Sequence, residues 1–141
     1  MKILMVGTGG VGEAAAVIAK QRDPNGDWLK LMVLSDFNLE RAQAVSERLA
    51  DARFPAEKVN ARNKDEVKAL IEKYQADLLF NACDPSFNET LFDVAYECGV
   101  RYSDMALSLS IPHPTDPYHK TNVKMGDYQF ARSEERRVGK E

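Results

Sequence analysis

Near its start the chain reads Ile3-Leu4-Met5-Val6-Gly7-Thr8-Gly9-Gly10-Val11-Gly12-Glu13-Ala14-Ala15-Ala16-Val17-Ile18-Ala19. The short apolar run at its beginning predicts a strand buried on both faces, and the alanine-rich segment at its end predicts a helix. Between them lies the pattern G-x-G-x-x-G. A glycine turn of this spacing, after a buried strand and before a helix, is typical of a βαβ unit that binds a dinucleotide.

Each glycine of this turn has a separate predicted role. Gly7 allows a tight turn out of the strand, and Gly9 lets the backbone approach a pyrophosphate. Gly12 lets the helix pack close to the sheet, and Gly10 leaves further room over the phosphates. The helix N-terminus offers unpaired N–H groups and a partial positive charge to a phosphate. The alternative is a tight strand-to-helix turn that binds no ligand.

Further strand-then-helix units follow along the chain. Strands are predicted at residues 29–34, 54–59, 78–80 and 101–103. Helices are predicted after three capping sites, which are Asn38, Asn63 with Glu66, and Ser86 with Glu89. Strands that alternate with helices in this way form repeated βαβ units, whose right-handed crossovers make a parallel sheet. The predicted fold class is α/β, a Rossmann-type doubly wound parallel sheet with strand order 3-2-1-4-5.

The alternation of strands and helices ends at Asp104. Residues 105–131 are rich in proline and predict mostly loop, without the sixth strand of a full doubly wound sheet. We therefore expect residues 1–131 to form a Rossmann domain that is truncated at its C-terminal end. The string at residues 132–141 resembles the translation of a sequencing-library adapter, so we expect a non-native tail there. The alternative for it is a charged, solvated tail or helix end.

The composition excludes several function classes. The 141 residues carry a net charge of −3, with 44% hydrophobic and 29% charged side chains, as in an ordinary soluble globular domain. The mild acidity argues against nucleic acid as a partner. No apolar run reaches the roughly 20 residues that span a bilayer, so no membrane partner is expected. Cys83 and Cys98 form no C-x-x-C pair, and His113 and His119 lack metal-ligand spacing, so we expect no metal site, no catalytic histidine and a cytoplasmic location.

Asp36 lies at the end of the second predicted strand, at about the 20-residue spacing from the glycine turn that is expected for the acid that binds the adenosine ribose. Its carboxylate would accept the ribose hydroxyls and repel a 2′-phosphate, which favours NAD over NADP. Arg41, in the next helix, is near enough to reach a phosphate and leaves NADP open. Phe37 is expected either to pack on the adenine or to pack in the core. The alternative for Asp36 itself is capping of the following helix.

The ends of the third and fourth strands supply further candidates, because ligands bind such sheets beyond the carboxyl ends of the strands. Asn60 and Ala61 are expected near the adenine. Asn81, Ala82 and Cys83 are expected along the cofactor toward the nicotinamide. Two alternatives stay open at this point: Asn81 would equally well satisfy local backbone groups, and Cys83 would equally well be a small packing residue.

Two later segments resemble the saccharopine dehydrogenase family. They read Asn81-Ala82-Cys83-Asp84-Pro85-Ser86-Phe87-Asn88 and Gly99-Val100-Arg101-Tyr102-Ser103-Asp104-Met105-Ala106. The segment Met105-Ala106-Leu107-Ser108-Leu109-Ser110, followed by Pro112-His113-Pro114, is similar to a bacterial saccharopine-dehydrogenase-like subgroup. The resemblance covers residues 1 to about 131.

The resemblance implies an N-terminal NAD(P)-binding Rossmann domain and a second domain that is catalytic and forms a homodimer. It implies an NAD(P)-dependent oxidoreductase that acts on a C–N bond of a small amino-acid-derived substrate. Cofactor-binding roles carry over onto Gly7, Gly9, Gly10, Val11, Gly12 and Asp36, and also onto Asn60, Ala61, Ala82 and Cys83. Because this sequence lacks the second domain, its catalytic residues stay unknown, and we expect the 141-residue chain alone to be inactive.

Two alternative functions stay open on the sequence. A non-catalytic domain that senses NAD(H) and regulates a partner would share all of these features. A methyltransferase that uses S-adenosylmethionine also has glycines after its first strand and an acid after its second. The third glycine, Gly12, stands at helix-packing spacing and favours a dinucleotide instead. The fifth strand lacks its usual neighbour, and its open edge predicts self-association.

Overall fold

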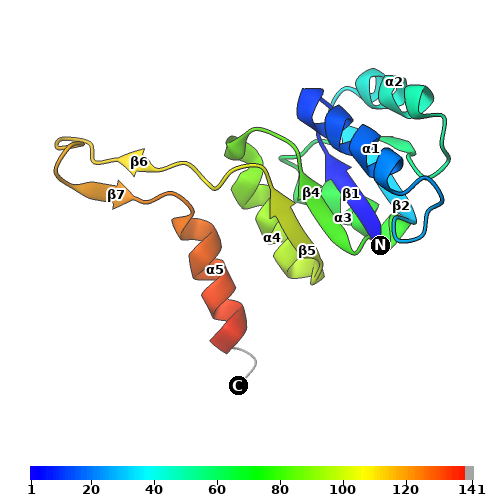
Figure 1. Ribbon diagram of the computed structural model, residues 1–141. Coiled ribbons are helices and arrows are strands. Elements are labelled where there is room, and N and C mark those ends of the chain that lie inside the picture. The colour runs from blue at the N-terminus through cyan, green and yellow to red at the C-terminus, as the bar shows by residue number, and fades with distance from the viewer. Residues whose placement is uncertain (139–141) are drawn as a thin grey trace.

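The computed structural model describes residues 1–138 of the chain and the side chains of residues 1–133. A five-stranded parallel sheet forms its centre (Figure 1). Its strands are β1 (Lys2–Val6), β2 (Leu31–Asp36), β3 (Ala56–Lys58), β4 (Leu78–Asn81) and β5 (Arg101–Asp104). They run in the order β3-β2-β1-β4-β5, which confirms the predicted strand order.

Helices cover both faces of the sheet (Figure 1). They are α1 (Gly10–Arg22), α2 (Leu39–Leu49), α3 (Lys64–Tyr74) and α4 (Asn88–Cys98). Helices α1 and α2 pack on one face and α3 and α4 on the other, so the core is divided into two clusters. Leu4 belongs to the α3/α4 cluster and Met5 to the α1/α2 cluster, and both side chains are fully buried. From Ile3 to Val6 the central strand β1 is apolar, because successive side chains enter opposite clusters, whereas Lys2 at its start is exposed.

Two of the predicted helix caps are confirmed. The Asn38 side chain accepts a hydrogen bond from the Arg41 N–H at the start of α2, so Asn38 caps this helix rather than Asp36. The Asn63 side chain accepts from the first-turn N–H groups of α3. Glu66 departs from the predicted capping box, because the Asn63 backbone N–H already donates to the Asn60 carbonyl oxygen.

The predicted cap at Ser86 is wrong. Asp84 begins this region instead, and its carboxylate accepts a hydrogen bond from the Ser86 N–H at 2.9 Å. A short 3-10 helix, η1 (Pro85–Phe87), follows and leads into α4. Proline lacks an N–H group and suits the first position of a helix. The helical segment therefore begins at Pro85, one residue before the predicted cap.

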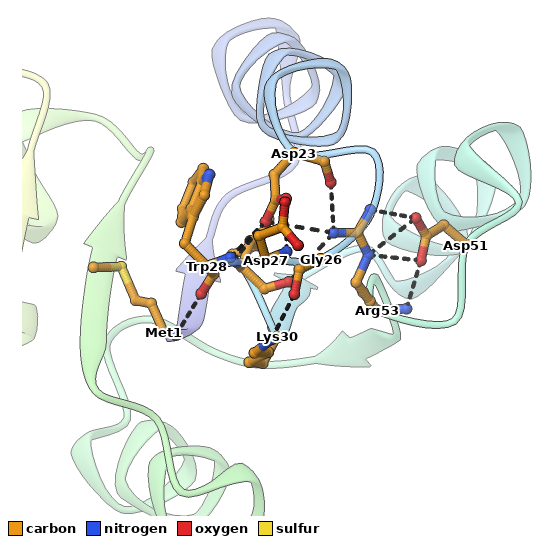
Figure 2. Close-up of polar contacts among 9 residues, drawn as sticks. Met1, Asp23, Gly26, Asp27, Trp28, Lys30, Asp51 and Arg53 are labelled. Carbon is orange, nitrogen blue, oxygen red and sulfur yellow. Dashed lines mark hydrogen bonds and ion pairs between the residues drawn. The ribbon is translucent and has the colours of Figure 1, made fainter.

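The loop between α1 and β2 is organised around Asp23, whose side chain is buried. Its Oδ1 accepts from the Asp27 N–H at 2.8 Å, and its Oδ2 accepts from the N–H groups of Trp28 and Leu29 at 3.0 and 2.7 Å (Figure 2). These bonds hold the backbone of Leu29 in the loop. Strand β2 consequently starts at Leu31 rather than at the predicted residue 29.

The chain continues past β5 into a C-terminal extension, residues 105–138. It contains the antiparallel strands β6 (Ile111–Pro112) and β7 (Thr121–Val123) and the helix α5 (Asp127–Val138). The hairpin projects away from the sheet, and α5 returns to contact α4 (Figure 1). The sequence predicted mostly loop here, because strands of two or three residues are too short to show an alternating pattern. Of the expected tail, residues 132–138 continue α5, and residues 139–141 lie outside the described residues.

Candidate functional site

The glycine turn joins β1 to α1 at the carboxyl edge of the sheet. Gly7 has a φ of +101°, which residues with a side chain rarely adopt. Its N–H donates to the Ser35 carbonyl oxygen at 2.8 Å. A Cβ atom on Gly7 would lie 2.9 Å from the Ala82 carbonyl oxygen. Glycine is therefore required where the turn passes between the ends of β2 and β4.

The remaining glycines of the turn face different surroundings. A Cβ atom on Gly12 would lie 2.1 Å from the Gly7 carbonyl oxygen, so its absence lets α1 pack directly on the turn. A Cβ atom on Gly9 or Gly10 would meet no atom of the described residues within 4 Å. Gly9 is the N-cap of α1 and contributes no side-chain acceptor. The first N–H groups of the helix thus border open space, which is the arrangement that binds a phosphate.

Asp36 lies beside this turn, and its side chain is almost fully buried. Its Oδ2 accepts hydrogen bonds from the backbone N–H and the Oγ1 of Thr8, both at 2.9 Å. Its Oδ1 accepts from the Asn38 N–H at 2.9 Å. Burial would raise the pKa of the Asp36 carboxyl, but these hydrogen bonds and Arg41, 3.8 Å from Oδ2, hold the pKa below its usual range. The carboxylate is ionised at neutral pH, and Oδ1 keeps acceptor capacity for a ligand hydroxyl.

A pocket of about 510 Å³ lies between the glycine turn and the loops that follow β2, β3 and β4. Its size is within the range of small-molecule and cofactor sites. The predicted residues that line it are Gly7, Gly9, Asp36, Phe37, Asn60, Ala61, Ala82 and Cys83. The rest of the lining comes from Val6, Arg41, Val59, Arg62, Asp84 and Phe87. The pocket thus lies where the sequence placed a ligand, beyond the carboxyl ends of the central strands.

Four predicted residues do not line this pocket. Gly10 and Val11 are exposed at the start of α1, and Gly12 is buried beneath the turn. Asn81 is buried, and its Nδ2 donates to the Asn88 Oδ1 at 2.8 Å while its Oδ1 accepts from the Cys83 N–H at 2.9 Å. The structure therefore places Asn81 under the loop after β4, where it satisfies protein groups.

Thr8, Arg62 and Phe87 belong to this region but are not among the residues predicted from the sequence. Thr8 ties the glycine turn to Asp36, but it stands at a variable position of the G-x-G pattern, which carries no signal. Arg62 directly follows Ala61, so its position after the third strand was the available signal. Phe87 belongs to the loop after β4, and only the fold brings it near Arg62, with the Arg62 Cζ 4.5 Å from the Phe87 ring centroid.

Cys83 lines the pocket, and its thiol is already bonded within the protein. Its Sγ donates to the Val6 carbonyl oxygen at 3.3 Å. Burial raises the pKa of the Cys83 thiol to about 11, and the negative charges of Asp36 and Asp84 act in the same direction. The thiol is neutral near pH 7, and a neutral thiol is a poor nucleophile.

The described residues form neither a metal-binding group nor a membrane-spanning helix. Within residues 1–138, the His, Cys, Asp and Glu side chains form no group of three or more that could hold a metal ion. None of the helices in the same described part of the chain combines the length and apolar character needed to cross a membrane. His113 and His119 lie on the C-terminal extension and do not line the pocket.

Three features of the site fit a dinucleotide: the unfilled space at Gly9, the N-terminus of α1, and the ionised Asp36 next to both. With the parallel sheet, they define a dinucleotide-binding Rossmann domain. The family described as the saccharopine dehydrogenase NADP binding domain matches residues 3–140. The chain therefore belongs to this family, and its cofactor is a nicotinamide dinucleotide.

Individual relatives agree with this assignment. Carboxynorspermidine synthase from Vibrio alginolyticus is 28% identical over 119 residues, which cover 79% of this chain and 28% of that protein. The apo saccharopine dehydrogenase (L-Glu forming) from Saccharomyces cerevisiae has a TM-score of 0.59 at 14% identity, over 73% of this chain and 21% of that chain. A wide-type short-chain dehydrogenase/reductase from Veillonella parvula, in complex with NADP, has a TM-score of 0.56 at 12% identity, over 76% of this chain and 48% of that chain. The two structures show the shared fold, and this chain spans 28% of the length of the curated relative.

Proposed function

We propose that this chain binds the cofactor of an NAD(P)-dependent, saccharopine dehydrogenase-like oxidoreductase that acts on a C–N bond of an amino-acid-derived substrate. The observation that carries the proposal is the pocket between the glycine turn and Asp36, in a chain of this family. A bound nicotinamide ring supplies a hydride donor or acceptor. Substrate binding and catalysis belong to a second domain, in a homodimer, so the 141-residue chain by itself binds cofactor without turnover.

Residues at the ends of three strands would hold the cofactor. The first N–H groups of α1 would bind the pyrophosphate in the open space at Gly9 and Gly10. The Oδ1 of Asp36 would accept a hydrogen bond from a ribose hydroxyl. Ala82 and Cys83, beyond β4, would line the nicotinamide half, where the neutral thiol adds no charge.

Binding measurements on matched variants test this function. The Gly9 backbone has a φ of −71°, which any residue adopts, and its Cβ position is open, so Gly9→Val is expected to fold normally while filling the phosphate space. Ala69→Val on the exposed surface of α3 is the control. Calorimetric titration should show NAD⁺ binding to the unchanged chain and to the control, and at least tenfold weaker binding to Gly9→Val. Binding of S-adenosylmethionine but of neither dinucleotide would contradict the proposal.

We also propose that the cofactor is NAD in preference to NADP. Two unit charges 4 Å apart repel by about 4 kcal/mol at an effective dielectric of 20, so a 2′-phosphate next to the Asp36 carboxylate would be disfavoured. Arg41 offsets part of this repulsion, because it lies 3.8 Å from the same carboxylate. The expected preference is therefore about tenfold, or about 1.4 kcal/mol.

Asp36→Asn tests this preference, since it removes the charge and keeps an acceptor oxygen. It should reduce the ratio of NAD⁺ to NADP⁺ affinity toward one. The control is Asp65→Asn, an exposed acid in the first turn of α3. A tighter affinity of the unchanged chain for NADP⁺ would show that Arg41 outweighs Asp36.

A further inference from the structure

Arg62 and Phe87 form a cation–π pair in the lining of the pocket. The Arg62 Cζ lies 4.5 Å from the centroid of the Phe87 ring. Arg62 comes from the loop after β3, and Phe87 is the last residue of η1 in the loop after β4. Both residues line the same pocket as Asp36. The pair thus joins two loops at the edge of the sheet where the cofactor is proposed to bind.

The described residues leave the hydrogen-bonding capacity of the Arg62 guanidinium unused. Among the residues whose side chains are described, 1–133, none accepts a hydrogen bond from this guanidinium. Its electrostatic influence reaches Asp84, whose pKa is held below its usual range mainly by hydrogen bonds from Ser86, with Arg62 adding to the effect. Arg62 is exposed, and both Arg62 and its partner Phe87 line the pocket. The guanidinium is therefore available to a ligand that enters the pocket.

The shape of that ligand follows from the pair itself. A guanidinium is planar and delocalised, and it stacks on aromatic rings with either face. Phe87 contacts the guanidinium of Arg62, and a second flat group in the pocket can stack on the same guanidinium. A further aromatic side chain, Phe37, lines the same pocket and is 70% exposed. A large exposed aromatic ring in a pocket gains by burial against an apolar, flat ligand.

The position along the sheet identifies which part of a dinucleotide meets this pair. The strand order places the loop after β3 next to the loop after β2, on the side of Asp36 away from the glycine turn. If the turn holds the pyrophosphate and Asp36 the ribose, the base extends toward Arg62 and Phe37. We propose that the guanidinium of Arg62, supported by Phe87, is the stacking platform for the adenine base. This inference rests on the proposed function and assigns a specific role within it.

A stacking role and an ion-pair role for Arg62 predict different patterns of ligand binding. A platform contributes to every ligand that contains adenine, whether or not a 2′-phosphate is present. An ion pair from Arg62 to a 2′-phosphate would contribute only to NADP. Lysine keeps the positive charge but lacks the planar guanidinium, so Arg62→Lys separates the two roles.

The experiment is a calorimetric titration with NAD⁺, NADP⁺, ADP-ribose and nicotinamide mononucleotide. We expect Arg62→Lys and Phe87→Leu each to weaken NAD⁺, NADP⁺ and ADP-ribose by a similar factor of about ten, within the range for stacking of one base. Binding of nicotinamide mononucleotide, which has no adenine, should not change. Arg22→Lys, an exposed arginine at the end of α1, is the matched control. Thermal unfolding of each variant verifies that the fold is retained.

Several outcomes would overturn the inference. Unchanged ADP-ribose affinity in both Arg62→Lys and Phe87→Leu would exclude the platform while leaving the proposed function intact. A loss confined to NADP⁺ in Arg62→Ala, with Arg62→Lys near normal, would make Arg62 a phosphate-binding residue instead. Failure of the unchanged chain to bind any of the adenine ligands would overturn the proposed function and the platform together.

Discussion

The C-terminal extension differs from the sheet and its four helices in the exposure of its apolar side chains. In the sheet, Leu4, Met5 and Leu34 are fully buried between the layers of helices. In the extension, Leu109 is 66% exposed and Tyr118 is 91% exposed. One chain thus contains a region organised by burial of apolar surface and a region whose apolar side chains face solvent.

Polar contacts, instead, connect the extension to the sheet. The buried residues of its described part are the polar pair Ser108 and Gln129 together with Gly126. Gln129 Nε2 donates to Asp104 at 2.7 Å, and the Tyr128 hydroxyl donates to Asp93 at 2.6 Å. A hydrogen bond to a charged group contributes about 1.5–3 kcal/mol net, so a few of them amount to little beside the burial of a core. We therefore expect the extension to open at a much smaller free-energy cost than the sheet.

The largest expected difference is in the response to truncation of a leucine. Leu4→Ala should lower the free energy of unfolding by about 3 kcal/mol, because it leaves a cavity between β1 and the α3/α4 layer. Leu109→Ala should change it by less than about 0.5 kcal/mol, because its side chain is already exposed. Urea titration followed by circular dichroism measures both. Similar losses for the two variants would mean that the extension is part of the cooperative core.

The second-largest expected effect is a loss of stability of the sheet region in acid. Burial would raise the pKa of Asp23, but the N–H groups of Leu29, Asp27 and Trp28 hold it below its usual range, and Asp36 is lowered in the same way. Their contribution is present above the unfolded-state pKa of about 3.9 and is lost as the pH falls through the lower folded pKa. Stability measured by urea titration should therefore decrease below about pH 4.

A substitution assigns this acid sensitivity to Asp23. Asp23→Asn should be less stable than the unchanged chain at pH 7, and the difference should narrow as the pH is lowered. Asp27→Asn, which alters an exposed acid in the same loop (Figure 2), is the control and should not show this narrowing. A difference that stays constant with pH would show that the Asp23 charge is not what stabilises the loop.

A smaller, local effect is expected at the contact between the two regions. Tyr128→Phe removes the hydrogen bond to the Asp93 carboxylate and should weaken the docking of α5 by about 2 kcal/mol. Native-state hydrogen exchange should show faster exchange in α5, with the amides of β1 unchanged. Tyr118→Phe, at a highly exposed position of the hairpin, is the control. Equal acceleration in β1 would mean that the extension and the sheet unfold together.

Substitutions on the hairpin surface should have the smallest effect on stability, but they should change the self-association of the chain. The open edge of β5 and the exposed Leu109, Ile111 and Tyr118 predict self-association. Replacing these three side chains with serine should reduce it while leaving the melting temperature nearly unchanged. Sedimentation velocity over a range of concentrations measures it, with Lys120→Ser as the control. A monomer at all concentrations for the unchanged chain would refute the expectation.

Much of the sheet and of the glycine turn was predictable from the sequence, because the signals are local. An apolar strand, three glycines at fixed spacing and an alanine-rich helix follow one another within one βαβ unit, and each constrains its own backbone. Asn38 and Asn63 also cap helices as predicted, since a cap bonds to N–H groups two or three residues away. The parallel strand order followed from the alternation of strands and helices.

Tertiary structure alone decided the features that join distant residues. The hydrogen bonds from Thr8 to Asp36 and the cation–π contact of Arg62 with Phe87 link separate loops, and no pattern within either loop reports the partner. Asn81 has the residue type of a ligand-binding side chain, yet its bonds to Asn88 and Cys83 hold it beneath the pocket. The order of strands, turns and helices along the chain was enough to predict which backbone segments meet at the carboxyl edge of the sheet, because each of these signals is short-range. Which side chains from those segments share the pocket was decided by packing across the sheet, where the partners are far apart in the chain.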